Sequence, residues 1–205
     1  MTHKGITNIS TDDVAVAQEL GYVIKLVGDV REVESGISAE VSPTFLPKNH
    51  PLASVNDVMN AVFVESIGIG ESMYYGPGAG QKPTATSVLA DIIRIARRLS
   101  DGNVGKPFNE FRRDLPLANP ADVKSNYYFA LDTPDEKGKI LHLSEIFNSE
   151  DISFEQVLQQ KANGTTARIV VITHAMSKTQ LQAVTEKLEA AEDFTVVNTL
   201  KVLSN

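Results

Sequence analysis

The sequence has no cysteine and no long apolar run, and both absences narrow what the protein can be. Without cysteine the 205-residue chain forms no disulfide and no cysteine-ligated metal site, which is typical of a reducing compartment. No apolar run approaches the roughly 18 residues that a membrane span needs, and the N-terminus lacks the apolar core of a signal peptide. We therefore expect a cytoplasmic protein with no membrane partner.

The sequence also lacks an excess of basic residues and any pair of histidines with the spacing of metal ligands. The formal net charge of −7 argues against nucleic acid as a partner, because a nucleic-acid surface needs an excess of lysine and arginine. His3, His50, His142 and His174 are scattered, and no two have the helical or hairpin spacing of metal ligands. We expect no metal site.

Several motifs of catalysis are also missing. The chain has no GxGxxG dinucleotide fingerprint and no phosphate-binding loop ending in Gly-Lys-Ser/Thr. Serine, histidine and aspartate are all present, but no GxSxG nucleophile elbow exists, so a small hydrolase has little support. The motifs alone assign no catalytic residue.

The most distinctive stretch runs from Met73 to Leu99 and begins with a glycine loop. The loop, Gly76-Pro77-Gly78-Ala79-Gly80, has three glycines in five residues, which lets the backbone approach a bulky group closely. Free amides at a helix start also suit an anion, so one interpretation is a loop that contacts a phosphate-bearing cofactor or a small substrate. The other is a tight turn between a strand and a helix, and spacing alone favours the turn.

A long amphipathic helix is expected after Pro83, capped by Thr84 or Thr86 and ending near Ser100. Its apolar residues recur at helical spacing and form one stripe. The stripe consists of Val88, Leu89, Ile92, Ile93, Ile95, Ala96 and Leu99.

Before this stretch the pattern predicts a capped helix and then short strands. Ser10 and Asp13 have the spacing of a capping box for a helix over 11–20. Prolines at 43, 47 and 51 are expected to end regular strand pairing, since proline donates no ladder hydrogen bond. The expected strands cover 22–27, 30–34, 37–41, 61–66 and 70–75, with a short helix over 52–59.

After it, a glycine-, asparagine- and proline-rich linker is expected over 101–124, followed by a second unit. The order strand, helix, strand, strand, helix, strand is that of a ferredoxin-like antiparallel sheet with two helices on one face. The expected strands cover 127–131, 152–159, 168–173 and 194–203. The expected helices cover 140–147 and 178–191, the second capped by Ser177, and a hairpin turn is expected at 162–164. The strand 168–173, the most apolar, should be central.

Four linked segments carry a resemblance to a known family. They are GITNIS-x-DD-x4-A-x2-LGYVIKLVG, NHPLASV, NAVFV and YGPGAGQKPTATSVLADII. In this order they resemble the C-terminal part of bacterial homoserine dehydrogenases of the longer, regulated type. The later segments LDTPDEKGKILHLSEIFNSEDISFEQVLQQ and ARIVVITHAMSKTQLQAVTEKL resemble the ACT domain that ends those enzymes.

The resemblance implies an α+β fold in three parts. Residues 1–99 would be the end of the catalytic and dimerisation domain, an antiparallel sheet remnant. Residues 100–124 would be a linker, and residues 125–205 a ferredoxin-like βαββαβ ACT regulatory domain. The parent enzyme interconverts homoserine and aspartate semialdehyde with NAD(P), in the biosynthesis of threonine, methionine and isoleucine.

The family's dinucleotide domain and its catalytic lysine and aspartate have no counterpart in the chain. The chain is therefore expected to be a C-terminal fragment that is inactive alone and binds no cofactor alone. A stand-alone ACT-type module for amino-acid binding or dimerisation, without catalysis, is the alternative.

The resemblance also implies two groups of site residues. Gly80 would lie against the NADP or NAD of the full-length enzyme, with Gly78 and Ala79 beside it. An ACT pocket would use Asp132, Gly138, Lys139 and Ile140 to bind a small amino-acid effector such as threonine, under allosteric regulation. Lys137 stands where the family pattern has proline, and a purely dimerising ACT unit is equally compatible.

Assembly is the last expectation. The sheet of the first part belongs to a dimer interface in the family, and the stripe on the helix after Pro83 lacks the domain that it would cover. An exposed apolar stripe needs another cover, so we expect a homodimer or a higher homo-oligomer.

Overall fold

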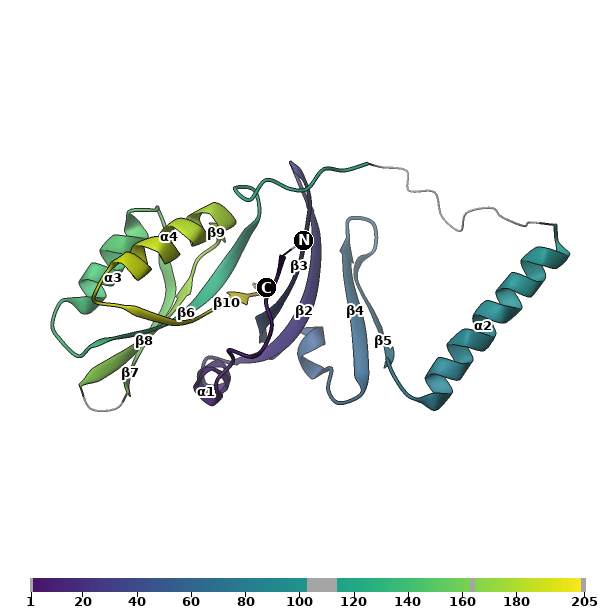
Figure 1. Cartoon of the computed structure of the whole chain (residues 1–205), viewed down its shortest axis with the longest axis horizontal. Coiled ribbons are helices and arrows are strands. Elements are labelled where there is room, and N and C mark those ends of the chain that lie inside the picture. The colour runs from purple at the N-terminus through teal and green to yellow at the C-terminus, as the bar shows by residue number, and fades with distance from the viewer. Residues whose placement is uncertain (1, 103–113, 163–164, 204–205) are drawn as a thin grey trace. The chain divides into compact units, whose positions relative to one another are not determined.

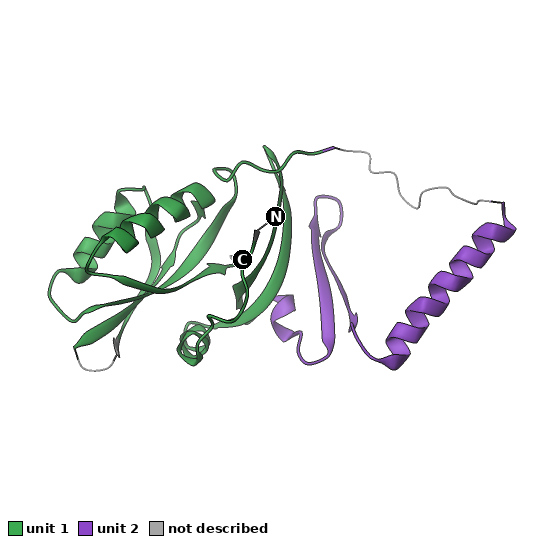
Figure 2. Cartoon of the chain, in the orientation of Figure 1, with its two compact units in different colours: residues 1–48, 115–205 green, residues 49–114 purple. Residues whose placement is uncertain are grey.

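The computed structural model describes residues 2–102, 114–162 and 165–203. The chain forms two compact units, one of residues 1–48 with 115–205 and the other of residues 49–114 (Figure 2). This division differs from the expected boundaries at residues 99 and 125, because the N-terminal strands join the sheet of the C-terminal half. The expected linker falls partly on residues 103–113, and the expected hairpin turn on 163–164, both outside the described residues.

The first unit contains one mixed sheet with helices on its faces (Figure 1). Its strands run in the order β1-β3-β10-β6-β8-β7, with β2 paired to β3 and β9 paired to β6. Their bounds are β1 Thr2–His3, β2 Tyr22–Val33, β3 Gly36–Pro47, β6 Lys124–Pro134, β7 Phe154–Ala162, β8 Thr166–Thr173, β9 Met176–Ser177 and β10 Thr195–Val202. The helices are α1 Thr11–Glu19, α3 Lys139–Asn148 and α4 Lys178–Ala190.

The predicted capping box at Ser10 and the predicted cap at Ser177 are both present, and the second is a complete capping box as well. The Ser10 hydroxyl accepts from the Asp13 amide at 3.1 Å, and the Ser177 hydroxyl accepts from the Gln180 amide at 3.1 Å. These bonds satisfy amides that have no partner inside α1 and α4. The βαββαβ order of the C-terminal half is also confirmed, and β8 lies between β6 and β7 as the apolar run predicted. Its assignment as an ACT domain stays a prediction.

The expected end of pairing at Pro43 is wrong. Strand β3 pairs with β2 in an unbroken antiparallel register from Gly36 to Pro47, with Pro43 opposite Leu26. On the other edge of β3, β1 pairs at Glu40 and Val41 and β10 pairs at Thr44 and Phe45. Pro43 lies between these two pairings, so its missing N–H interrupts neither.

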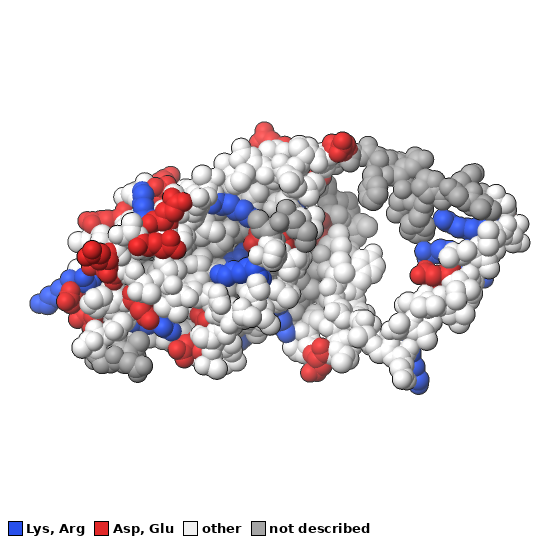
Figure 3. Space-filling view, viewed as in Figure 1, with Lys and Arg blue, Asp and Glu red and all other residues white. Residues whose placement is uncertain are grey.

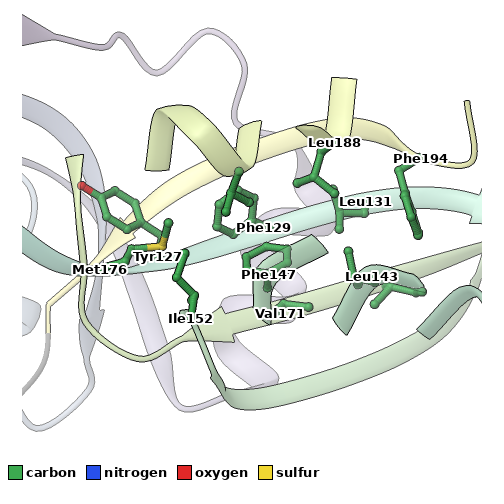
Figure 4. Packing of buried hydrophobic residues seen from close by; sticks show 12 residues of the cluster. Tyr127, Phe129, Leu131, Leu143, Phe147, Ile152, Val171, Met176, Leu188 and Phe194 are labelled. Atoms are coloured by element: carbon green, nitrogen blue, oxygen red, sulfur yellow. The ribbon is translucent and has the colours of Figure 1, made fainter. Parts of the chain in front are cut away.

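The two faces of the sheet are buried against different elements because side chains alternate along each strand. On one face α3 and α4 cover Phe129 and Leu131 of β6, and Phe147 of α3 meets Phe129 edge-on with ring centroids 5.2 Å apart (Figure 4). On the other face Val16 and Ala17 of α1 pack with a cluster from β3, β6, β8 and β10. That cluster consists of Phe45, Tyr128, Ala130, Val170, Ile172, Leu200 and Val202.

The second unit contains the turn η1 (Pro51–Ser54), the hairpin of β4 (Met59–Ser66) and β5 (Gly70–Pro77), and helix α2 (Gln81–Ser100). Both predicted hairpin strands are confirmed. The helix expected over 52–59 is wrong: only a single 3-10 turn forms, because Val55 is extended and Asp57 adopts a positive φ of 56°. Figure 1 shows α2 as one uninterrupted helix.

Helix α2 starts earlier than predicted and buries none of its side chains. Its N-cap is Gly80, with no side-chain cap, while the Thr86 hydroxyl bonds the Lys82 carbonyl inside the helix at 2.8 Å. Thr84 and Thr86 are therefore not caps. The exposed fractions of the stripe are Val88 54%, Leu89 57%, Ile92 56%, Ile93 44%, Ile95 58% and Leu99 56%.

Within residues 2–102, 114–162 and 165–203, no helix combines the length and apolarity required to cross a membrane.

Candidate functional site

The glycine loop runs from the end of β5 to the start of α2, and two of its glycines are constrained, Gly78 by a neighbouring side chain and Gly80 by its backbone conformation. A Cβ on Gly78 would lie 1.6 Å from the amide nitrogen of the Asn60 side chain, so no other residue fits without moving Asn60. Gly80 has φ 121° and ψ 158°, a conformation that side-chain-bearing residues rarely adopt. Gly78, Ala79 and Gly80 are all exposed, so this stretch of backbone is open to a ligand.

The start of α2 has the chemistry of an anion contact. Gly80 accepts from the Thr84 amide at 3.1 Å, which closes the first turn, but no side chain among the described residues caps the amides before it. The N-terminal end of a helix carries partial positive charge from these unpaired amides. A phosphate group next to Gly80 would find donors and no steric obstacle.

A second candidate site is a hollow of about 320 Å³ in the first unit, at the start of α3. Gly138 is the N-cap of α3 and has a left-handed backbone with φ 91°, and no side chain caps it. Its neighbours Lys139 and Ile140 also line the hollow, so the structure brings these three predicted residues together. The remaining lining residues are Thr133, Pro134, Asp135, Glu136, Lys137, Leu141, Gln159, Ala167 and Ile169.

Asp132, the fourth residue expected in this pocket, is not part of its lining. Its carboxylate accepts two hydrogen bonds from Arg168, from Nε at 2.8 Å and from Nη2 at 3.0 Å. Arg168 also reaches Asp12 of α1 at 3.4 Å. Because side chains alternate along β6, Asp132 faces the α1 side with Tyr128 and is held in an ion pair there.

Sequence reasoning missed Thr133, which lines this hollow. Its side chain is 2% exposed, and its hydroxyl oxygen has no hydrogen-bond partner within the described part of the chain. A buried hydroxyl without a partner costs about 1–3 kcal/mol, so this atom is suited to a ligand's polar group. The alternation of Phe129 and Leu131 toward the helices could have identified Thr133 from the sequence.

The start of α3 is held in place by charged groups. Asp193 accepts from Lys139 Nζ at 3.0 Å and lies 2.9 Å from His142 Nδ1, and Glu136 is 3.3 Å from the same ammonium. The hydrogen bond to Asp193 raises the pKa of Lys139, and the hydrogen bonds from Lys139 and His142 lower the pKa of Asp193. Lys139 therefore stays cationic at the edge of the hollow.

Over the ranges that the structure describes, no three histidine, aspartate or glutamate side chains are grouped to hold a metal ion.

Comparison with known proteins gives one consistent result. The homoserine dehydrogenase family profile matches residues 1–93. The homoserine dehydrogenase of Lactococcus lactis is 58% identical to this chain, and the match covers 100% of this chain and 48% of that enzyme. The homoserine dehydrogenase of Bacillus subtilis is 34% identical, and the match covers 92% of this chain and 44% of that enzyme. The crystal structure of a homoserine dehydrogenase from Thiobacillus denitrificans has a TM-score of 0.89 at 30% identity, covering 99% of this chain and 48% of that one.

The match in sequence and the match in fold are both to dehydrogenases. The chain belongs to the homoserine dehydrogenase family. It spans about half the length of the curated relatives that it matches.

Proposed function

We propose that the chain is the C-terminal portion of a homoserine dehydrogenase, comprising the end of the substrate domain and a regulatory unit. The observation that supports this most is the similarity over the whole chain, in sequence to the Lactococcus lactis enzyme and in fold to the Thiobacillus denitrificans enzyme. The parent reaction is the reversible interconversion of homoserine and aspartate semialdehyde. The alternative is a separate amino-acid-binding or dimerisation module without catalysis.

In this proposal the glycine loop contacts the nicotinamide dinucleotide of the complete enzyme. The loop fits such a group, because Gly78 and Gly80 present bare backbone and the first amides of α2 have no side-chain cap. When bound, the dinucleotide supplies or accepts the hydride. The contribution of Gly80 is to let the cofactor approach the backbone, and that of the α2 amides is to donate hydrogen bonds to an anionic group.

The chain alone is expected to show no turnover with homoserine and NADP, because it has no fingerprint for a dinucleotide domain. The measurement is reduction of NADP followed by absorbance, with the Lactococcus lactis enzyme as the positive control. Turnover above background by the purified chain would contradict the proposal. A reading frame for a dinucleotide domain directly upstream supports the enzyme, whereas an independent promoter and a stop codon there support the separate module.

The hollow at Gly138 supports a second function, regulation by a small amino acid bound to an ACT-type unit. Three features favour a ligand there: the uncapped start of α3, the positive φ of Gly138, and the buried Thr133 hydroxyl without a partner. The α3 amides suit a carboxylate, and Thr133 provides a hydroxyl at the buried end. A unit that only dimerises would leave that hydroxyl unexplained.

Titration of the chain with threonine, methionine, isoleucine and lysine is expected to give saturable heat for one of them. The Thr133→Val variant should weaken that binding by about tenfold, the value of one hydrogen bond to a buried group. Thr195→Val, which removes an exposed hydroxyl on β10, should bind as the unchanged chain does. If none of the four amino acids binds, or if both variants bind equally, the hollow is not an effector site.

A further inference from the structure

A larger hollow, of about 470 Å³, lies elsewhere in the first unit, between α4 and the strands β3 and β10. One wall is a single face of α4, formed by Lys178, Leu181, Thr185 and Glu189. The opposite wall comes from β3 and the N-terminal segment, with Glu40, Ser42, Pro43, Lys4 and Asn8, and the floor from Tyr127 and residues 196–201. It shares no lining residue with the hollow at Gly138.

The hollow exists because the sheet forks beneath it. Strand β10 pairs with β3 only at Thr44 and Phe45, and earlier along β3 the strand β1 is the neighbour instead. Lys4, just after β1, bridges the fork: its amide donates to the Val41 carbonyl at 2.8 Å, and its ammonium donates to the Thr199 carbonyl. Helices α3 and α4 pack on the β6 and β8 part of the sheet, and the start of α4 reaches β3 through the ion pair of Lys178 with Glu40.

The buried side of this hollow carries basic groups. Lys201 is 5% exposed and pairs with Asp29, which also accepts from Arg31 at 2.8 Å. Lys178 pairs with Glu40 at 2.7 Å. Arg31 and Asp29 do not line the hollow; the lining itself contains three lysines, Lys4, Lys178 and Lys201, and two glutamates, Glu40 and Glu189.

Lys4 adds a further cation at the mouth. Its ammonium bonds only neutral oxygens within the described residues, the Thr199 carbonyl and the Asn198 side-chain oxygen at 3.4 Å. Burial lowers the pKa of Lys4 more than nearby Asp13 raises it, and burial is also the main cause of the lowered pKa of Lys201. Figure 3 shows blue atoms on the face of the first unit where the strands adjoin α4.

The acidic end lies apart from this cationic end. Glu189 is exposed and eleven residues along α4 from Lys178, which is about 16 Å at a rise of 1.5 Å per residue. Between them Leu181, Val196 and Pro43 give the hollow an apolar lining. A ligand with a carboxylate at the Lys4 and Lys178 end and a short aliphatic body matches this arrangement.

We propose that the hollow between α4 and the β3–β10 fork binds a small aliphatic carboxylate. The carboxylate would give the Lys4 ammonium an anionic partner beside the two neutral oxygens that it bonds, and the aliphatic part would cover Leu181 and Val196. Such a site is independent of the glycine loop and of the Gly138 hollow. A negative result for this site would therefore leave the proposed function unaffected, and the reverse also holds.

The test uses the chain itself with butyrate as the probe, at constant ionic strength adjusted with chloride. Butyrate is expected to shift the backbone amide resonances of Ser42, Lys178 and Leu181 in a saturable manner. Lys4→Gln should weaken binding by about tenfold, the loss of one charge-assisted hydrogen bond. Lys187→Gln is the matched control on α4, because Lys187 pairs with Glu150 and lines no part of the hollow.

Leu181→Asp provides a second test, because it places a carboxylate in the apolar part of the hollow and should abolish butyrate binding. The folded state of each variant is checked by its dispersed amide spectrum. Three results would overturn the proposal: no saturable shift with butyrate, equal losses in Lys4→Gln and Lys187→Gln, or inorganic phosphate binding as tightly as butyrate. The last would mean that the site recognises charge alone.

Discussion

Replacing Asp13 with alanine is expected to lower the free energy of unfolding by about 3–5 kcal/mol, since it removes the N3 side chain of the α1 capping box and the acceptor of the Tyr128 hydroxyl and of one of the two bonds from the Asn198 amide. Asp13 is 2% exposed, and its carboxylate accepts from the Ser10 amide at 2.9 Å, the Tyr128 hydroxyl at 2.9 Å and the Asn198 side-chain amide at 3.0 Å. These donors come from the start of α1, from β6 and from β10. One carboxylate therefore holds α1 onto the C-terminal sheet.

Urea denaturation followed by circular dichroism measures this effect. Asp12→Ala is the matched control, because Asp12 lies next in the same helix with a side chain that is 73% exposed. The control should leave the unfolding midpoint almost unchanged. Equal midpoints for the Asp12→Ala and Asp13→Ala variants would show that the buried network does not hold α1 in place.

The same carboxylate makes a defined contribution to acid stability. Burial by itself raises the pKa of Asp13, but the hydrogen bonds from Ser10, Asn198 and Tyr128 outweigh it, and the pKa is lowered overall. A lowered pKa in the folded state gives stability that is fully present above the unfolded value of about 3.9 and is lost as the pH falls through the folded value. Asp13→Asn should therefore flatten the loss of stability on acidification.

Local features of the fold could be predicted from the sequence, and non-local ones could not. Ser10 with Asp13 and Ser177 with Gln180 lie three residues apart, so their capping boxes follow from spacing alone. The pairing of β3 with β10 joins residues that lie more than 150 positions apart, and no local pattern indicates it. The expected domain boundaries were different for this reason.

For the candidate sites too, the sequence predicted some residues and missed others. Gly138, Lys139 and Ile140 are consecutive and line one hollow at the start of α3, and their role in binding an effector stays a prediction. Asp132 and Thr133 are adjacent, yet they face opposite sides of β6, and the resemblance named Asp132 although the alternation from Phe129 and Leu131 assigns Thr133 to the helix side. The loop at Gly80 could be identified from its glycines. That α2 begins at Gly80, with no side-chain cap, could not be predicted, because it depends on the backbone conformation of Gly80.

The N-terminal segment of the first unit contributes to the core of the C-terminal sheet. An open sheet with helices on one face only would leave Tyr128, Ala130, Val170 and Ile172 in water. Val16 and Ala17 of α1 and Phe45, near the end of β3, pack on this second face, so residues 1–48 complete the core of the C-terminal half. The first unit is therefore built from two segments that are distant in the sequence, residues 1–48 and 115–205.

The second large effect concerns assembly, and we propose that the chain forms a homo-oligomer that covers the stripe on α2. Burying one large aliphatic side chain contributes about 1.5–3 kcal/mol, so covering Val88, Ile92, Ile95 and Leu99 would contribute on the order of 6–12 kcal/mol. This is comparable to the whole stability of an ordinary domain. All four side chains are at least half exposed in the single chain.

Sedimentation velocity at micromolar concentration is expected to show a dimer or a larger defined species for the unchanged chain. The double variant Ile92→Glu with Ile95→Glu should lose that species and aggregate or unfold, because two charges cannot be covered by an apolar partner surface. Ala90→Glu is the matched control, since residue 90 lies on the opposite side of α2 at 100° per residue. A stable, monodisperse monomer of the unchanged chain would refute the assembly, and so would equal disruption by Ala90→Glu.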